Sequence, residues 1–238
     1  MPTNYTQFQD MDVIENYKYT VDIVFCIDAT GSMSPIMDNM KDEARTLYRK
    51  FIEKMERESK QVDQCRVKVI AFRDFGYSDA PAMTQEGFFT LPEQDADFEA
   101  ALKRIRPTGG GDDKENAWEA VATAIQSDWT TKGSKHRQVV VLMTDEEALD
   151  LSTRASCAGY PKNMPKTLAE LKDWWNGHVK IGNYEKEAGR LIVFAPNKGH
   201  WCTMTGWDRC WTDLSTASGK GLKDKNLEII LNVLVKSI

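Results

Sequence analysis

The sequence predicts an α/β protein with a doubly wound, mainly parallel sheet, helices on both faces and one short antiparallel edge strand. Four short, largely apolar runs have the pattern of strands buried on both faces, at residues 21–27, 65–72, 138–143 and 190–195. Segments with apolar residues three or four positions apart separate these runs, as in amphipathic helices. Strands that alternate with helices favour a parallel sheet.

The elements follow in a regular order along the chain. Ser34 can cap the first helix, and Pro35 suits its first position. A short run at 87–91, closed by Pro92, is expected to be the edge strand. The expected helices carry their apolar faces over residues 36–55, 98–105, 117–125, 168–175 and 227–234.

Composition limits the classes of protein that the chain can represent. The 238 residues are 41% hydrophobic and 28% charged, which is typical of a globular protein and excludes disordered and fibrous classes. A formal charge of -5 argues against general nucleic-acid binding. No apolar run approaches the roughly 20 residues that a membrane span needs.

We expect a polar lead-in at residues 1–18 and a single domain at 19–238, because no Pro/Gly/Ser-rich linker divides the chain. The five cysteines are scattered, odd in number and unaccompanied by an export signal. These features predict a cytoplasmic protein with reduced thiols.

Polar clusters follow several of the predicted strands. They are Asp28/Thr30/Ser32, Arg73/Asp74, the glycine-rich turn 108–113 and Asp145/Glu146/Glu147. Ligands of doubly wound sheets bind at the carboxyl ends of the strands, so we expect the first, third and fourth clusters to meet there. Carboxylates and hydroxyls are hard oxygen ligands, which suit Mg²⁺, Mn²⁺ or Ca²⁺ better than zinc or copper.

The segment Asp28-Ala29-Thr30-Gly31-Ser32-Met33 resembles the Asp-x-Ser/Thr-Gly-Ser-Met signature of von Willebrand factor type A domains. The resemblance extends in element order over residues 20–195. It implies a metal-ion-dependent adhesion site, through which the domain grips a partner protein that usually donates a carboxylate. Carried over residue by residue, it implies Asp28, Thr30, Ser32 and Asp145 as metal ligands.

The second loop departs from the commonest pattern of that family, Gly-Gly-Thr. Gly110-Gly111-Asp112 is similar to a Gly-Gly-Gly-Asp-x-x-Glu variant of bacterial and hemicentin-like members, with Glu115 as the terminal acid. The resemblance implies Asp112 as the fifth ligand, with Thr108 as the alternative. An ionised Asp112 makes the cluster formally one charge negative around a divalent cation. The cation is then held more firmly and is a weaker electrophile toward an acidic partner, so a neutral or amide oxygen or a basic surface becomes the more plausible ligand.

Simpler roles remain open for several of these residues. Asp112 or Asp113 could cap a helix that starts near Lys114, and Thr30 and Ser32 could serve only as turn residues. Arg73 and Asp74 are expected to pair with each other on the rim. Glu146 and Glu147 are expected to be solvated.

Residues 199–211 contain three tryptophans, His200, Cys202 and Cys210. A closed zinc site needs four ligands with paired short spacings, which this segment lacks. We expect the tryptophans to pack over an end of the sheet or to form part of a binding surface.

These features favour a metal-dependent protein-binding module, using Mg²⁺ or alternatively Mn²⁺ or Ca²⁺, within a larger bacterial complex. The chain has no nucleophile elbow, no Cys/His catalytic constellation and no phosphate-binding loop with its lysine, so we expect no enzymatic activity. One alternative is a Mg²⁺-dependent hydrolase or phosphotransferase, with Asp28 as nucleophile or Asp145 holding the metal. Another is a structural domain whose cation only stiffens the loops.

Overall fold

The computed structural model describes residues 18–77, 80–110, 114–133, 135–215, 231–232 and 235–236, with backbone alone at 36, 39–45, 47 and 215. The predicted lead-in therefore lies outside the described residues except for Lys18. Most of the predicted closing helix also lies outside them, although Leu231 and Val235 are described and are buried in the core.

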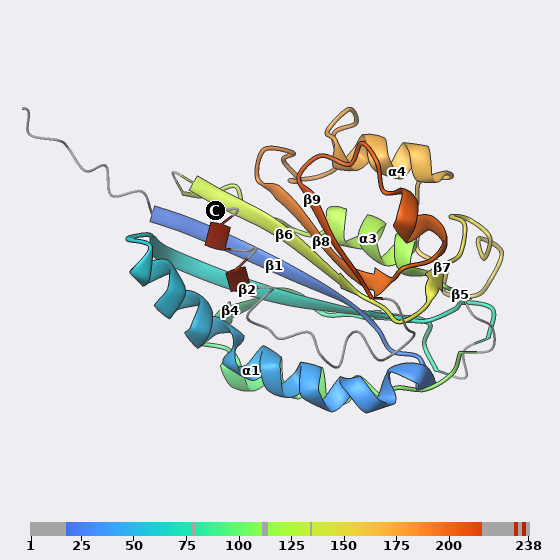
Figure 1. Ribbon diagram of the computed structural model, residues 1–238, viewed down its shortest axis with the longest axis horizontal. Coiled ribbons are helices and arrows are strands. Elements are labelled where there is room, and N and C mark those ends of the chain that lie inside the picture. The colour runs from blue at the N-terminus through green and yellow to red at the C-terminus, as the bar shows by residue number, and fades with distance from the viewer. Residues whose placement is uncertain are drawn as a thin grey trace, which may run out of the picture.

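The main sheet has the strand order β3-β2-β1-β6-β8-β9, and β4 also pairs with β2 (Figure 1). Five strands are parallel: β1 (Lys18–Asp28), β2 (Gln61–Phe72), β6 (Lys135–Met143), β8 (Gly189–Pro196) and β9 (Cys210–Ser215). The expected antiparallel edge comes in two short segments, β3 (Met83–Gln85) and β4 (Phe89–Leu91). The predicted fold class is confirmed.

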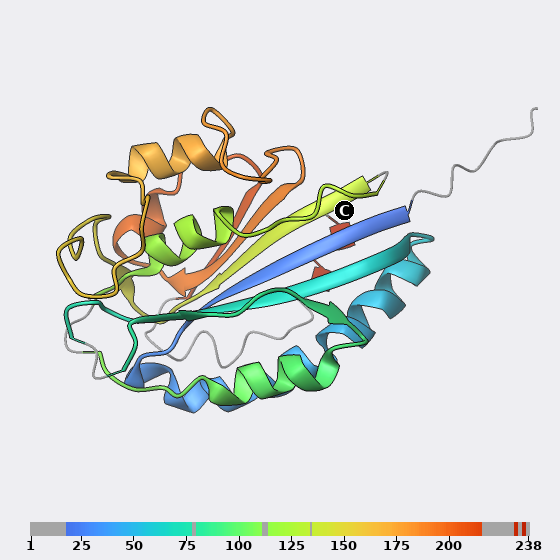
Figure 2. The same ribbon diagram turned by 180° about the vertical axis from the view of Figure 1, so that it is seen from behind.

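Helices cover both faces of this sheet (Figures 1 and 2). The long α1 (Ser34–Arg57) and α2 (Asp95–Arg104) lie on one face, and α3 (Ala117–Ile125) and α4 (Leu168–Trp175) on the other. Two 3-10 turns, η1 (Gly31–Met33) and η2 (Gly199–Thr203), follow the carboxyl ends of β1 and β8. A separate two-stranded sheet joins β5 (Lys114–Glu115) to β7 (Glu147–Ala148).

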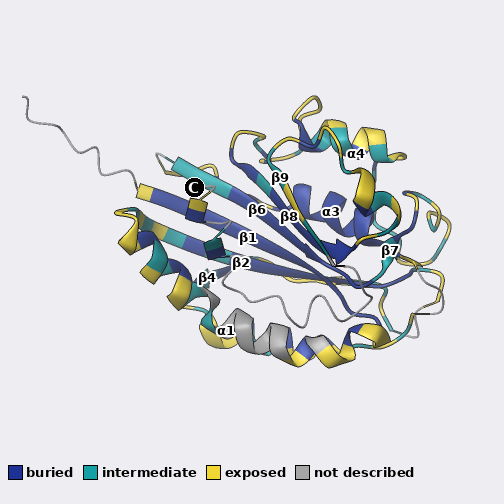
Figure 3. Ribbon diagram, in the orientation of Figure 1, coloured by how far each residue is buried: buried dark blue, intermediate teal, exposed yellow. Residues whose placement is uncertain are grey.

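The central strands are buried on both sides, which explains their nearly continuous apolar sequence (Figure 3). In β1, Ile23 and Phe25 pack on the α1 side, while Val24 and Cys26 pack on the α3 side. No helix in the described part of the chain is both long enough and apolar enough to span a membrane.

Strand β9 was not predicted, because it looks unlike the buried strands. It is the outer parallel strand of the sheet, and its sequence Cys-Trp-Thr-Asp-Leu-Ser mixes polar and apolar residues. Trp211 is 38% exposed there. An edge strand has one half-solvated side, so hydrophobicity alone does not reveal it.

A charged residue, Asp22, lies in the middle of the buried strand β1. Asp22 is fully buried and accepts hydrogen bonds from Arg66 Nε at 2.8 Å and Nη2 at 2.6 Å, and from the backbone N–H of Thr130 at 2.7 Å. Register places Asp22 beside Arg66 on β2. The aspartate thus ties β1 to β2 and to the segment that precedes β6.

We predict that Asp22→Ala destabilises the fold by about 3–5 kcal/mol, because it leaves the partly buried Arg66 without its counter-ion. Urea unfolding followed by circular dichroism measures the change. Asp63→Ala is the matched control, since Asp63 forms an exposed ion pair with Lys18 (3.4 Å) and its loss should cost less than about 1 kcal/mol. Equal effects of the two substitutions would contradict the prediction.

Candidate metal centre

The first predicted loop begins where β1 ends. Asp28 is fully buried, and its Oδ1 accepts hydrogen bonds from Thr30 N at 3.0 Å and from Thr30 Oγ1 at 2.6 Å. This turn lets Thr30 lead into the 3-10 turn η1, which carries Ser32. Thr30 precedes η1 without making a side-chain cap, so its hydroxyl serves Asp28 and not the helix end.

The third loop meets the first because β1 and β6 are parallel neighbours whose carboxyl ends lie side by side. Asp145 follows β6, and its Oδ1 accepts a hydrogen bond from Ser32 Oγ at 3.0 Å. The structure therefore brings together four of the predicted ligands, Asp28, Thr30, Ser32 and Asp145.

The hydroxyl groups of Thr30 and Ser32 contact the two carboxylates and each other. Thr30 donates its hydrogen to Asp28 and Ser32 donates its hydrogen to Asp145. Thr30 Oγ1 and Ser32 Oγ also lie 3.1 Å apart, within hydrogen-bond distance, and either hydroxyl can be the donor. Two oxygen atoms held in this way are suited to share a cation.

The glycine-rich second loop lies against the first through its backbone. Gly31 N donates to Gly109 O at 3.0 Å, and Thr108 N donates to Ala29 O at 3.0 Å. Gly110 has φ +92°, and a Cβ there would lie 3.3 Å from that of Thr30, so glycine is needed for the close approach. Thr108 is exposed and close to the first loop, and its role as the alternative ligand stays a prediction.

Asp112 lies outside the described residues, so its role as fifth ligand also stays a prediction. The simpler role given to Asp112 or Asp113 is wrong, because α3 begins at Ala117 with Asn116 as its N-cap. Residues 114–115 instead form β5, which pairs with β7 and so joins the second loop to the third. Glu115, the other acid of the resemblance, is buried.

The predicted pairing of Arg73 with Asp74 is wrong. Arg73 donates from Nε to Thr108 O at 3.0 Å and from Nη2 to Arg106 O at 2.6 Å, so it holds the backbone of the second loop. Asp74 is bound instead by Arg154, which donates from Nε and Nη2 at 2.7 Å each. Adjacent residues of an extended chain point to opposite sides, which separates these two side chains.

Thr144 is a site residue that the sequence analysis missed. Its Oγ1 donates to Asp28 Oδ2 at 2.7 Å, so that both oxygens of Asp28 are held by hydroxyls. Thr144 stands directly before Asp145, at the end of a predicted strand next to the predicted one at 21–27. Its place at the carboxyl end of a predicted buried strand, beside a predicted ligand, was the feature of the sequence that could have identified it.

Burial sets the electrostatics of the cluster. It raises the pKa of Asp28 to about 6, against the hydrogen bonds of Thr30 and Thr144, and Asp145 raises it further. Burial also raises the pKa of Asp145, against its hydrogen bond from Ser32. In both cases the cause is the loss of hydration of the charged form.

Two other buried aspartates differ from Asp28 because each is paired with an arginine. Asp22 and Asp74 are each bound by an arginine through two hydrogen bonds. Asp28 is as deeply buried, yet within the described residues it forms no ion pair, and neither does Asp145. Two neighbouring carboxylates that pair with no basic side chain among the described residues, accompanied by two hydroxyl oxygens, form a donor set that fits Mg²⁺.

This donor set contains hydroxyl groups as well as carboxylates. The described residues contain no group of three or more histidine, cysteine, aspartate or glutamate side chains suited to hold a metal. A cation here would therefore depend on Thr30 and Ser32 as well as on the carboxylates.

Two of the three tryptophans in the 199–211 segment pack into the core, whereas Trp211 lies on the edge strand β9 and is 38% exposed. Trp201 and Trp207 are buried against Trp118 of α3, with ring centroids 4.6 Å and 5.6 Å away. His200 contacts Asp150 at 2.8 Å, and Cys202 contacts Asn197 at 3.1 Å.

The expectation that Glu146 and Glu147 are solvated is wrong. Both are half-buried, and they form ion pairs with Lys198 at 2.6 Å and with Lys114 at 3.2 Å. The lysines neutralise these two acids at the rim of the site.

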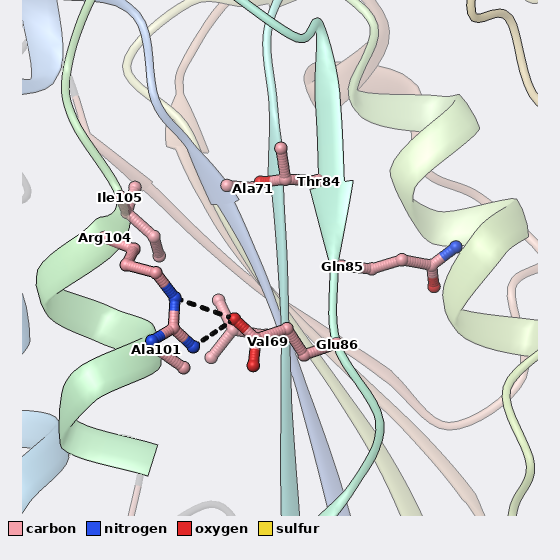
Figure 4. Close-up of a pocket in the computed structure, with 8 residues that line it drawn as sticks. All are labelled: Val69, Ala71, Thr84, Gln85, Glu86, Ala101, Arg104 and Ile105. Carbon is pink, nitrogen blue, oxygen red and sulfur yellow. Dashed lines mark hydrogen bonds and ion pairs between the residues drawn. The ribbon is translucent and has the colours of Figure 1, made fainter. Parts of the chain in front are cut away.

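A cavity of about 240 Å³ lies apart from this cluster, between α2 and the β2–β3 edge (Figure 4). Its charged lining residues, Arg104 and Glu86, pair with each other, with Arg104 Nε 3.1 Å from Glu86 Oε1. Its other lining residues are uncharged: Val69, Ala71, Thr84, Gln85, Ala101 and Ile105. We assign no metal chemistry to this cavity.

Comparison with protein families gives one match that covers about half of the chain. A family model described as von Willebrand factor type A domain matches residues 23–147, which include the first loop and Asp145. No curated protein sequence matches the chain.

Several solved structures share the fold at low sequence identity. A von Willebrand factor type A protein from Catenulispora acidiphila aligns with a TM-score of 0.53 and 15% identity, over 92% of this chain and 43% of that one. The pilus adhesin SpaC from Lactobacillus rhamnosus GG aligns with a TM-score of 0.51 and 13% identity, over 93% of this chain and 31% of that one. Proximal thread matrix protein 1 from the mussel byssus aligns with a TM-score of 0.50 and 13% identity, over 92% of this chain and 49% of that one. The chain thus spans less than half of each of these structures.

We predict that Thr144→Val destabilises the protein by about 1–3 kcal/mol at neutral pH, because one oxygen of the buried Asp28 carboxylate loses its donor. Thr144→Ser keeps the hydroxyl and should lose much less. Urea unfolding in metal-free buffer compares the two variants. If valine is tolerated as well as serine, the hydroxyl does not support Asp28.

Proposed function

Because the chain belongs to the von Willebrand factor type A domain family, we propose that it is a binding module that docks another protein through a divalent cation. The observation that carries the proposal is the buried Asp28 carboxylate, which lies beside Asp145 and two hydroxyl oxygens and has no arginine partner of the kind that Asp22 has. We expect Mg²⁺, with Mn²⁺ or Ca²⁺ as alternatives.

The proposed ligands are Asp28, Thr30, Ser32 and Asp145, with Asp112 as the fifth. The cation would neutralise the carboxylates and offer its remaining coordination positions to water and to an oxygen atom of the partner. The hydrogen bonds from Thr30 to Asp28 and from Ser32 to Asp145 pre-orient the hydroxyl oxygens for that role.

Asp112 bears on the choice of partner. An ionised carboxylate at this position gives the ligand set one negative charge more than the cation neutralises. We propose that the partner presents a neutral oxygen, such as an amide carbonyl, or a basic surface around the contact. The family resemblance of the second loop supports this proposal.

We also propose that the domain works inside a larger bacterial assembly. One structural neighbour is a pilus adhesin of which the aligned part is 31%, so the same fold there is one part of a longer protein. At this low sequence identity the similarity supports a shared fold only. Adhesion is a property of that protein.

A hydrolase or phosphotransferase that uses Asp28 as nucleophile is less consistent with the geometry. Asp28 is fully buried, and both of its oxygens accept hydrogen bonds, from Thr30 and from Thr144. The lysines on the third-loop rim, Lys114 and Lys198, are paired with glutamates. We therefore propose binding and not catalysis.

Isothermal titration with Mg²⁺ tests the metal centre. Asp28→Asn, Asp145→Asn and Ser32→Ala should each weaken binding at least about tenfold, which corresponds to about 1.4 kcal/mol. Asp112→Thr should weaken it less, by removing one charge. Asp63→Asn changes an exposed acid far from the loops and should bind as the wild type does. Wild-type protein that takes up no Mg²⁺, Mn²⁺ or Ca²⁺ would refute the proposal.

Capture of a partner tests the docking role. The immobilised full chain should retain a protein of its native host in Mg²⁺ and release it in EDTA, and Asp28→Ala should retain none. If the partner stays bound in EDTA, the cation has a purely structural role. Turnover of generic phosphoesters that stops in Asp28→Asn would favour the hydrolase instead.

A further inference from the structure

Arg73 follows β2 directly and is buried, with only 4% of its surface exposed. Its guanidinium group donates to three backbone carbonyl oxygens, those of Thr108 at 3.0 Å, Arg106 at 2.6 Å and Pro81 at 3.0 Å. Buried arginines are usually paired with an acid, as Arg66 is with an aspartate on β1. Arg73 forms no ion pair of this kind within the described residues, so its hydrogen bonds hold backbone and not a counter-ion.

Two of these bonds hold the start of the second loop, and the loop passes the restraint on to the first. Thr108 is bound on both sides, because its carbonyl oxygen accepts from Arg73 and its N–H donates to Ala29 O at 3.0 Å. The N–H of Gly31 donates to Gly109 O at 3.0 Å. Arg73 is therefore connected through a single residue of the second loop to the backbone of the first.

The end of the second loop is held by the same turn after β2. The N–H of Phe75 donates to Asn116 Oδ1 at 3.0 Å. Asn116 is fully buried and is the N-cap residue of α3, where the loop has ended. Segment 73–75 thus holds the second loop at both of its ends.

The charge of Arg73 acts against a cation at this place. Burial lowers the pKa of Arg73, and the nearby charges of Asp28 and Glu115 offset part of this effect. A guanidinium group close enough to interact with Asp28 repels a divalent cation bound there. Electrostatics alone would therefore favour a neutral side chain at position 73. The three carbonyl contacts are the favourable contribution of the arginine, because its planar fork of donors reaches all three at once and a lysine ammonium group lacks that geometry.

We propose that Arg73 is a positioning residue of the metal centre. It holds the second loop against the first, so that the ligand of the second loop, Asp112 or alternatively Thr108, reaches the cation with less ordering of the backbone on binding. This inference rests on the proposed function, since it concerns the same cation.

Isothermal titration of the full chain with Mg²⁺ separates positioning from charge. Arg73→Lys keeps the charge and loses the fork of donors, and Arg73→Gln loses both. Positioning predicts that each variant binds Mg²⁺ at least about tenfold more weakly, the equivalent of about 1.4 kcal/mol. A purely electrostatic role predicts unchanged binding for the lysine variant and tighter binding for the glutamine variant, and that result would overturn the proposal.

Hydrogen exchange in metal-free protein gives a readout that does not depend on the cation. The amides of Thr108 and Gly31 form the bonds between the two loops, and both should exchange faster in Arg73→Lys. Arg66→Lys is the matched control, because Arg66 lies on the same strand and also donates three hydrogen bonds, two to Asp22 and one to Asp128 O. It should leave Mg²⁺ affinity and the exchange of these two amides as in the wild type.

A double-mutant cycle tests whether Arg73 acts through the second loop. The effect of Arg73→Lys on Mg²⁺ affinity should shrink in a chain that carries Asp112→Ala and Thr108→Ala, since the loop then supplies no side-chain ligand. The effect should persist beside Ser32→Ala, which changes the first loop. A general loss of stability would give the same effect in both backgrounds and would contradict the proposal.

The outcomes distinguish this inference from the proposed function. Wild-type protein that binds no divalent cation refutes the metal centre itself. Wild-type protein that binds Mg²⁺ while Arg73→Lys binds it equally well refutes only the positioning role. Weakening by Arg66→Lys equal to that by Arg73→Lys also refutes it, because the effect would then reflect the stability of the whole fold.

Discussion

The buried carboxylate of Asp28 at the end of β1 is the constraint around which the carboxyl edge of the sheet is arranged. A charge without water is costly, and hydrogen bonds from Thr30 and Thr144 offset only part of that cost, as the raised pKa of Asp28 shows. Two other buried aspartates, Asp22 and Asp74, are each stabilised by an arginine. Asp28 forms no such ion pair within the described residues, and the carboxylate of Asp145 acts on it from nearby, so the chemistry favours a small cation.

The parallel sheet brings the loops of the site together. Strands β1 and β6 are hydrogen-bonded neighbours that run in the same direction, so the loops that follow them meet although Ser32 and Asp145 are 113 residues apart. The second loop belongs to no strand of the main sheet, and other contacts hold it. Arg73 binds its backbone carbonyls, and β5 pairs with β7 beyond Asp145. These contacts fix the frame in which the hydroxyl oxygens face each other.

The same edge of the sheet carries the tryptophan cluster, which gives the α3 side a rigid apolar wall. Trp118 contacts Trp201 and Trp207, so a segment that looks irregular in sequence becomes part of the core. The cluster belongs to the hydrophobic core on this side of the sheet.

The sequence alone determined the class of fold and the four oxygen-bearing side chains that meet, because burial on both faces and the residues at strand ends are local properties of the chain. It did not reveal β9, whose half-solvated edge position hides the apolar pattern. Only the tertiary structure decided the partners of Arg73 and Asp74 and the role of Thr144. A hydrogen bond between distant segments depends on which strands are neighbours and on which side each residue faces. That information is set by the packing of the whole sheet and not by any short stretch of residues.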